Sequence, residues 1–106
     1  MYYELENGEK VRLTITNAAL YKLRAENRPE YDRYLKAIST PRKDFDLIFD
    51  VLTVIYTGYL CGLQGTDAQP VTFEEFIDLA KQDADENAQA YLQLTSKKKA
   101  ASVKRS

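Results

Sequence analysis

Residues 42–63 read RKDFDLIFDVLTVIYTGYLCGL, an almost unbroken apolar segment long enough for about six turns of helix. Beyond its first residues, the polar positions are spaced i, i+4, i+7 and i+11: Asp46, Asp50, Thr53 and Thr57. On a helix this spacing forms one narrow stripe on an otherwise apolar cylinder, and such a helix is buried on most sides. The segment predicts a central helix from about Arg42 to Leu63. We expect the stripe to face solvent, with contact to a partner as the alternative.

The central helix has too few consecutive apolar residues for a membrane span. A span needs about 20 of them. After Asp50 the apolar run is shorter than that, and Asp44 and Asp46 lie near its start. The sequence therefore predicts a soluble protein with no membrane contact.

Before this helix, two short runs surround a tight-turn signal. The runs are residues 2–6 and 10–16, and Asn7-Gly8 lies between them. Asn-Gly is typical of a two-residue hairpin turn in which both central residues take a positive φ. In the second run, apolar residues alternate with polar ones: Val11, Leu13 and Ile15. We expect an N-terminal β-hairpin that packs on the helices, because a lone hairpin is marginally stable.

Two helices are expected between the hairpin and the central helix. The first runs to about Glu26 and is capped by Thr16 or Asn17. The second begins at Pro29, since proline suits the first position of a helix. Its apolar residues are spaced i, i+3, i+4 and i+7: Tyr31, Tyr34, Leu35 and Ile38. Thr40 then caps the central helix.

Two further helices are expected after the central one. Glycines and a proline between residues 62 and 70 mark a loop, and Thr72 with Glu75 forms a capping box. Asp83 begins a last helix. The fold class expected is mainly α with an N-terminal β-hairpin: a compact bundle of about four to five helices around one central apolar helix. We expect a single globular domain over residues 1–95 and a basic, disordered tail over 96–106.

The composition argues against most catalytic and metal-binding chemistry. The chain has no histidine, the commonest general acid/base and metal ligand, so no Ser-His or Cys-His pair can form. Its single cysteine, Cys61, cannot form an internal disulfide, and the N-terminus lacks the pattern of a signal peptide. We expect a cytoplasmic protein that is not an enzyme and has no catalytic, cofactor-binding or metal-binding residues.

Two short motifs have structural interpretations. Asp83-x-Asp85-x-Asn87 resembles the start of a calcium loop, but the glycine and the glutamate that the loop needs further on are missing. We expect a capped helix start there. Gly58-x-x-x-Gly62 suits one close crossing on the central helix, with a dimer contact as the alternative.

The order of the predicted elements, with three of their segments, is similar to that of one family. A hairpin on an Asn-Gly turn leads into NAALYKL at residues 17–23. The long apolar helix follows with DLIFDVL at 46–52, and then TFEEFID at 72–78. Over about residues 5–95, this order resembles the tail assembly chaperones of long-tailed phages and prophages of Gram-positive bacteria.

The resemblance implies a non-enzymatic role in the cytoplasm of the bacterial host. It implies that the chain coats the helical tape-measure protein, helps to recruit the tail-tube protein, and is absent from the finished virion. We expect an apolar groove between helices to hold an amphipathic segment of the client. The residues expected to line it are Tyr56, Tyr59, Phe73 and Phe76. Self-association is also expected, because coating a long client needs many copies.

The basic segment at residues 97–105 has two interpretations. It holds five basic residues and no acidic one. Many chaperones of this family are made in short and long forms by a programmed ribosomal slip, and codons for Lys97-Lys98-Lys99 form a slippery run of adenines. In the alternative interpretation, the chain is a small prophage regulatory or nucleic-acid-binding protein that contacts phosphates through this tail. We favour the first, because no aromatic residue is interleaved with the lysines.

Overall fold

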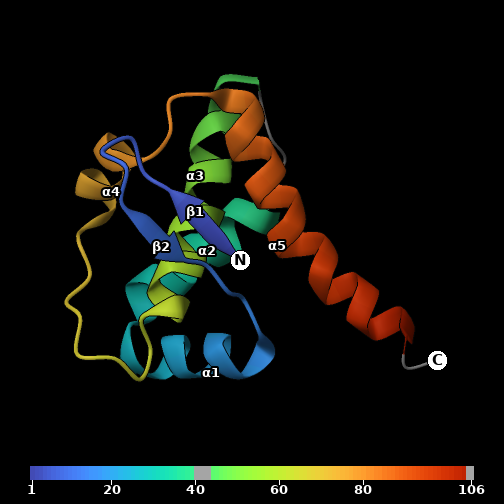
Figure 1. Ribbon diagram of the computed structural model, residues 1–106. Helices are drawn as coiled ribbons and strands as arrows, with labels where there is room; N and C mark the ends of the chain where they lie inside the picture. Colours follow the sequence, from blue (N-terminus) through green and yellow to red (C-terminus); the bar gives the residue numbers. More distant parts are fainter. Residues whose placement is uncertain (40–43, 105–106) are drawn as a thin grey trace.

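The computed structural model describes the chain over residues 1–39 and 44–104, and its side chains over 1–39 and 47–95. The described residues form one β-hairpin and five helices (Figure 1). In chain order the elements are β1 (Tyr2–Glu4), β2 (Lys10–Arg12), α1 (Asn17–Glu26), α2 (Arg28–Ser39), α3 (Asp44–Gly62), α4 (Phe73–Leu79) and α5 (Ala84–Lys104). This confirms the mainly α fold with an N-terminal hairpin that the sequence predicts.

Helix α3 lies at the centre of the molecule and contacts α1, α2, α4, α5 and β2 (Figure 1). Every residue from Val51 to Gly62 is buried. The prediction of a central apolar helix is therefore confirmed. No helix in the described part of the chain is long and apolar enough to cross a membrane.

The polar stripe on α3 was predicted to face solvent, and at two of its four positions this is wrong. Thr53 and Thr57 are both buried. Their hydroxyls donate to the carbonyls of Phe49 and Thr53, one turn earlier, at 2.7 and 2.9 Å. A threonine can be buried in this way because its hydroxyl is satisfied by its own helix. Asp50 is half-buried, and the side chain of Asp46 lies outside the described residues.

The hairpin turn also differs from the prediction. The strands pair antiparallel with Tyr3 opposite Val11. The Gly8 N–H donates to the Leu5 carbonyl at 2.9 Å, and Gly8 has a φ of +90°. Among the described residues, a positive φ occurs only at glycine, so the prediction that Asn7 shares it is wrong. The connection is a longer hairpin loop in which glycine alone takes the left-handed conformation.

Strand β2 is shorter than predicted because the chain leaves the sheet for α3. The expected run extended to Thr16, but β2 ends at Arg12. The Thr14 N–H donates to the Gly58 carbonyl at 3.2 Å. A Cβ atom on Gly62 would collide with the Arg12 carbonyl oxygen. The glycine motif on α3 therefore permits a close crossing, as expected, and the crossing partner is the chain at the end of β2.

Helices α1 and α2 begin close to the predicted positions. Thr16, one of the two expected caps, accepts the Ala19 N–H on its side-chain oxygen at 3.1 Å. Pro29 is the second residue of α2 and not its first. The expected cap at Thr40 lies outside the described residues.

Helix α4 begins with the predicted capping box. The Thr72 side chain accepts the Glu75 N–H at 3.2 Å, and the Glu75 carboxylate accepts the Thr72 N–H at 2.9 Å. Helix α5 continues past residue 96 to Lys104, beyond the predicted end of the last helix. Side chains from Ser96 onward are outside the described part of the chain, so the disordered tail over 96–106 stays a prediction.

Candidate protein-binding site

The four residues predicted to line a client groove lie together, in an aromatic cluster between α3 and α4. Ring centroids of Tyr56 lie 5.4 Å from Phe73 and 5.3 Å from Phe76, and Tyr59 lies 5.1 Å from Phe76. Tyr56, Tyr59 and Phe76 are buried, and Phe73 is half-buried. The Arg33 guanidinium lies 4.6 Å from the centroid of the Phe73 ring. The contacts show these aromatic residues joining α4 to the core; their role in client binding stays a prediction.

The two tyrosines of this cluster also hold the segment that enters α4. The Tyr56 hydroxyl donates to the Val71 carbonyl at 2.7 Å, and the Tyr59 hydroxyl accepts the Val71 N–H at 3.1 Å. Burial, the largest cause, raises the pKa of Tyr56 to about 12. The hydroxyl therefore stays neutral and keeps its hydrogen bond throughout the physiological range.

An apolar groove opens elsewhere, between α1 and α2. It has a volume of about 330 Å³. Its lining includes Leu20, Tyr21, Arg24, Tyr31, Leu35 and Ile38, and we call it the α1–α2 groove. Tyr21 is 68% exposed, Leu35 39% and Ile38 42%. Exposed large apolar side chains that line one groove on a small protein are typical of a binding surface.

The sequence indicates the α2 side of this groove, but its periodicity does not show that this side is exposed. The apolar residues of α2 have the spacing of one helical face. The structure buries Tyr34 and leaves Leu35 and Ile38 partly exposed. Since α1 covers only part of α2, the apolar face of α2 is wider than its contact with the core.

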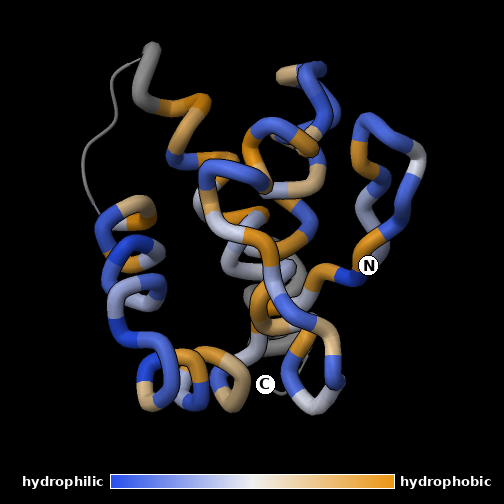
Figure 2. The backbone as a smooth tube through the Cα atoms, turned by 90° about the vertical axis from the view of Figure 1, so that its left-hand side faces the viewer, coloured by the Kyte–Doolittle hydropathy of each residue, from blue (hydrophilic) through white to orange (hydrophobic). Residues whose placement is uncertain are grey.

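A second set of exposed apolar residues lies at the start of α3. Leu47, Ile48 and Phe49 are consecutive and all exposed. Figure 2 shows hydrophobic colouring in this first part of α3. Three consecutive exposed apolar residues are unusual on a helix in water, and they form a second apolar surface, apart from the lining of the α1–α2 groove.

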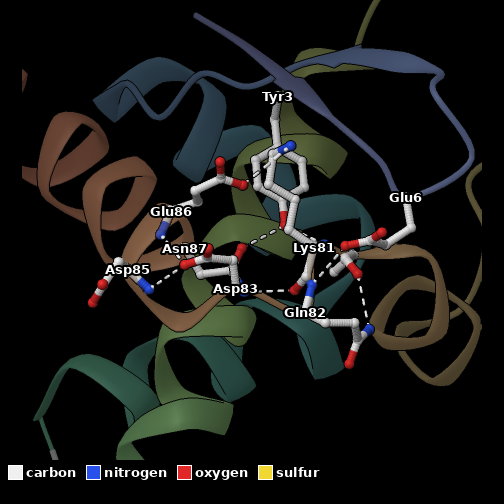
Figure 3. A network of polar contacts seen from close by, with 9 residues as sticks. Tyr3, Glu6, Lys81, Gln82, Asp83, Asp85, Glu86 and Asn87 are labelled. Atoms are coloured by element: carbon white, nitrogen blue, oxygen red, sulfur yellow. Dashed lines mark hydrogen bonds and ion pairs between the residues drawn. The ribbon is translucent and has the colours of Figure 1, made fainter.

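The hairpin is tied to the start of α5 by a polar network (Figure 3). The Tyr3 hydroxyl donates to Asn87 Oδ1 at 2.6 Å and accepts the Lys81 N–H at 2.8 Å. Asn87 Nδ2 in turn donates to the Lys81 carbonyl at 2.7 Å. Burial raises the pKa of Tyr3, while its hydrogen bond from Lys81 acts in the opposite direction. This network joins residues far apart in the sequence and holds β1 beside α5.

The motif that resembles a calcium loop is a helix cap. Asp83 Oδ1 accepts the backbone N–H groups of Asp85 and Glu86 at 2.9 and 3.1 Å. The Asn87 side chain is engaged with Tyr3. In the described part of the chain, no three histidine, cysteine or acidic side chains are grouped to hold a metal ion. The expected capped helix start is confirmed.

The single thiol lies in the core. Cys61 is buried, and burial raises its pKa to about 11. A thiol with a raised pKa is protonated at neutral pH and is a poor nucleophile. Cys61 therefore acts as a small apolar side chain of α3.

Comparison of the chain with protein-family models, with curated proteins and with solved structures gives no match. The resemblance to tail assembly chaperones therefore rests on the residues of this sequence.

Proposed function

We propose that this chain is a non-enzymatic phage tail assembly chaperone that holds an amphipathic helix of the tape-measure protein in the α1–α2 groove. The proposed site of action is the cytoplasm of the bacterial host. There the bound chain helps to recruit tail-tube protein, and several copies associate along one client. Production of short and frameshifted long forms belongs to the same proposal.

The observation that carries the proposal is the apolar α1–α2 groove. Amphipathic helices bind by placing residues spaced i, i+3, i+4 and i+7 into such a groove. Tyr21 on α1 and Leu35 with Ile38 on α2 offer apolar contacts to those residues. The groove is at the small end of ligand-site volumes, which suits a few anchoring side chains of a longer partner.

A basic residue at the edge of the groove favours a client segment with negative charge. Arg24 lines the groove, and its guanidinium lies 5.5 Å from the centroid of the Tyr21 ring. A cation beside an apolar groove favours an acidic residue next to the apolar stripe of the client. The preferred client segment is therefore an amphipathic helix with glutamate or aspartate beside its apolar face.

The test measures binding of the purified chain to helical segments of the tape-measure protein encoded in the same genome. Leu35→Glu and Ile38→Glu place a charge in the groove at partly exposed positions. Each is expected to weaken binding by about tenfold or more, as loss of an interface anchor does. Leu92→Glu is the matched control, since Leu92 is 55% exposed on α5 and does not line the groove.

Binding that is unaffected by the groove variants, or weakened equally by Leu92→Glu, would contradict the proposal. Binding to RNA or DNA that falls steeply with salt, with no affinity for the tape-measure segments, would favour the alternative of a nucleic-acid-binding protein.

A further inference from the structure

The main-chain groups of β1 are paired on one side only. Met1 and Leu13 exchange two hydrogen bonds, of 2.8 and 3.1 Å, and the Leu5 N–H donates to the Glu9 carbonyl at 2.8 Å. In an antiparallel pair, residues that bond across the ladder alternate with residues whose N–H and C=O point away from it. The odd-numbered residues of β1 therefore bond to the second strand. The N–H and C=O groups of the even-numbered residues point to the outer edge.

The opposite edge of the hairpin is already covered. The Thr14 N–H donates to the Gly58 carbonyl, and the chain at Arg12 lies against Gly62 of α3. The edge of β1 at Tyr2 and Glu4 is thus the free edge of this two-stranded sheet. An edge strand with unpaired N–H and C=O groups is a template for another strand.

The free edge borders a hollow of about 350 Å³ between β1 and α5. Tyr2 is 71% exposed and Glu4 is also exposed. Six of the residues lining the hollow define its two sides: Tyr2, Glu4, Lys81, Glu86, Gln89 and Gln93. We call this site the β1–α5 hollow. A strand edge on one side and a helix on the other is the arrangement in which peptide-binding domains add a strand.

The two sides of the hollow are held at a fixed spacing. The Tyr3 side chain extends from β1 to Asn87 of α5 and to the Lys81 N–H (Figure 3). Lys81 lines the hollow, Asn87 follows the lining residue Glu86, and Tyr3 itself is buried. A site whose sides are already positioned loses less entropy when it binds a partner.

We propose that the β1–α5 hollow binds an extended, uncharged polar peptide segment of a partner protein, which adds to β1 as a third strand. The N–H and C=O groups of Tyr2 and Glu4 supply the pairing. Two glutamines, Gln89 and Gln93, offer amide groups to its side chains. The lining carries two lysines, Lys10 and Lys81, and two glutamates, Glu4 and Glu86, so its side-chain charges balance, which favours an uncharged segment. This site shares no lining residue with the α1–α2 groove and takes an extended partner, not a helical one.

The test begins with a library of random peptides of about nine residues, displayed on yeast and selected on the purified chain. Peptides that are enriched are then synthesised and titrated by fluorescence anisotropy. Glu4→Pro removes the outward N–H, and proline is tolerated on a free strand edge. Glu4→Thr keeps that N–H and changes only the side chain. We expect affinity to fall about tenfold or more in Glu4→Pro and to stay within about threefold in Glu4→Thr, as loss of a main-chain hydrogen bond requires.

A second variant tests the helix side without changing β1. Gln93→Trp fills the hollow from α5 and is expected to abolish peptide binding, whereas Leu92→Trp on the same helix retains it. No enrichment of peptides on the wild-type chain, or equal affinities for Glu4→Pro and Glu4→Thr, would overturn the proposal. A wild-type dimer in sedimentation that Glu4→Pro converts to a monomer would also overturn it, because a second copy would then occupy the edge.

Discussion

At the scale of single residues, the Tyr3 hydroxyl connects the N-terminal hairpin to the start of α5. It donates to Asn87 Oδ1 and accepts the Lys81 N–H, in surroundings that are mostly buried. When a shared partner is removed, the buried donor and the buried acceptor are both left unsatisfied. The resulting loss of stability is greater than the net contribution of one ordinary hydrogen bond. The network therefore decides how firmly the hairpin is held against α5.

Tyr3→Phe removes this hydroxyl and leaves two groups unsatisfied. The expected loss in the free energy of unfolding is about 1–3 kcal/mol, measured by urea denaturation. Tyr2→Phe is the matched control, since Tyr2 is exposed on the same strand, and should change stability by less than about 0.5 kcal/mol. Equal effects of the two variants would show that the network contributes nothing to stability.

Residue identities alone did not reveal this network. In the sequence, Asp83 and Asn87 indicate only a helix start or part of a calcium loop, and no pattern relates either residue to Tyr3. A contact between Tyr3 and Asn87 depends on how the hairpin folds back over the helices. No local pattern encodes that contact, because local patterns relate residues within a few turns of each other.

At the scale of elements, local signals were reliable for the helix caps. The capping box of Thr72 and Glu75 and the cap at Thr16 needed only neighbouring residues, and the structure confirms both. The stripe at Thr53 and Thr57 was misjudged because both hydroxyls bond within α3. Polarity predicts exposure only when the polar group needs an outside partner.

The contact between the end of β2 and α3 makes a testable difference between two glycines. A Cβ on Gly62 would meet the Arg12 carbonyl, which is backbone and cannot easily move. Gly62→Ala should therefore destabilise the fold by about 1–3 kcal/mol, as overpacking does. A Cβ on Gly58 would lie 3.3 Å from Leu94 Cδ1, a flexible side chain.

Gly58→Ala is thus the control for Gly62→Ala. Its slight crowding is offset by a gain of up to about 1 kcal/mol in helix propensity, so its stability should stay near that of the wild type. Thermal unfolding of both variants gives the comparison. A greater loss of stability in Gly58→Ala than in Gly62→Ala would contradict the prediction, because the closest approach of the chain to α3 would then be at Gly58.

At the scale of the whole molecule, most of the residues predicted to bind the client are buried, and the accessible apolar residues lie elsewhere. From the resemblance to tail assembly chaperones we expected a client groove lined by Tyr56, Tyr59, Phe73 and Phe76. The structure brings these four together but buries three of them. Among the side chains that the structure describes, exposed apolar residues gather at the α1–α2 groove and at the start of α3, with Tyr2 and Leu92 elsewhere. Sequence periodicity identifies apolar faces, but only the packing shows which face has no partner.

The most direct test of the central claim is hydrogen–deuterium exchange of the chain with and without a bound helical segment of the tape-measure protein. We predict that the segment slows exchange in α1 and α2, over residues 17–39, because the client covers the α1–α2 groove. Exchange in residues 97–105 should not change. A segment that binds the chain while exchange in α1 and α2 stays the same would contradict the account.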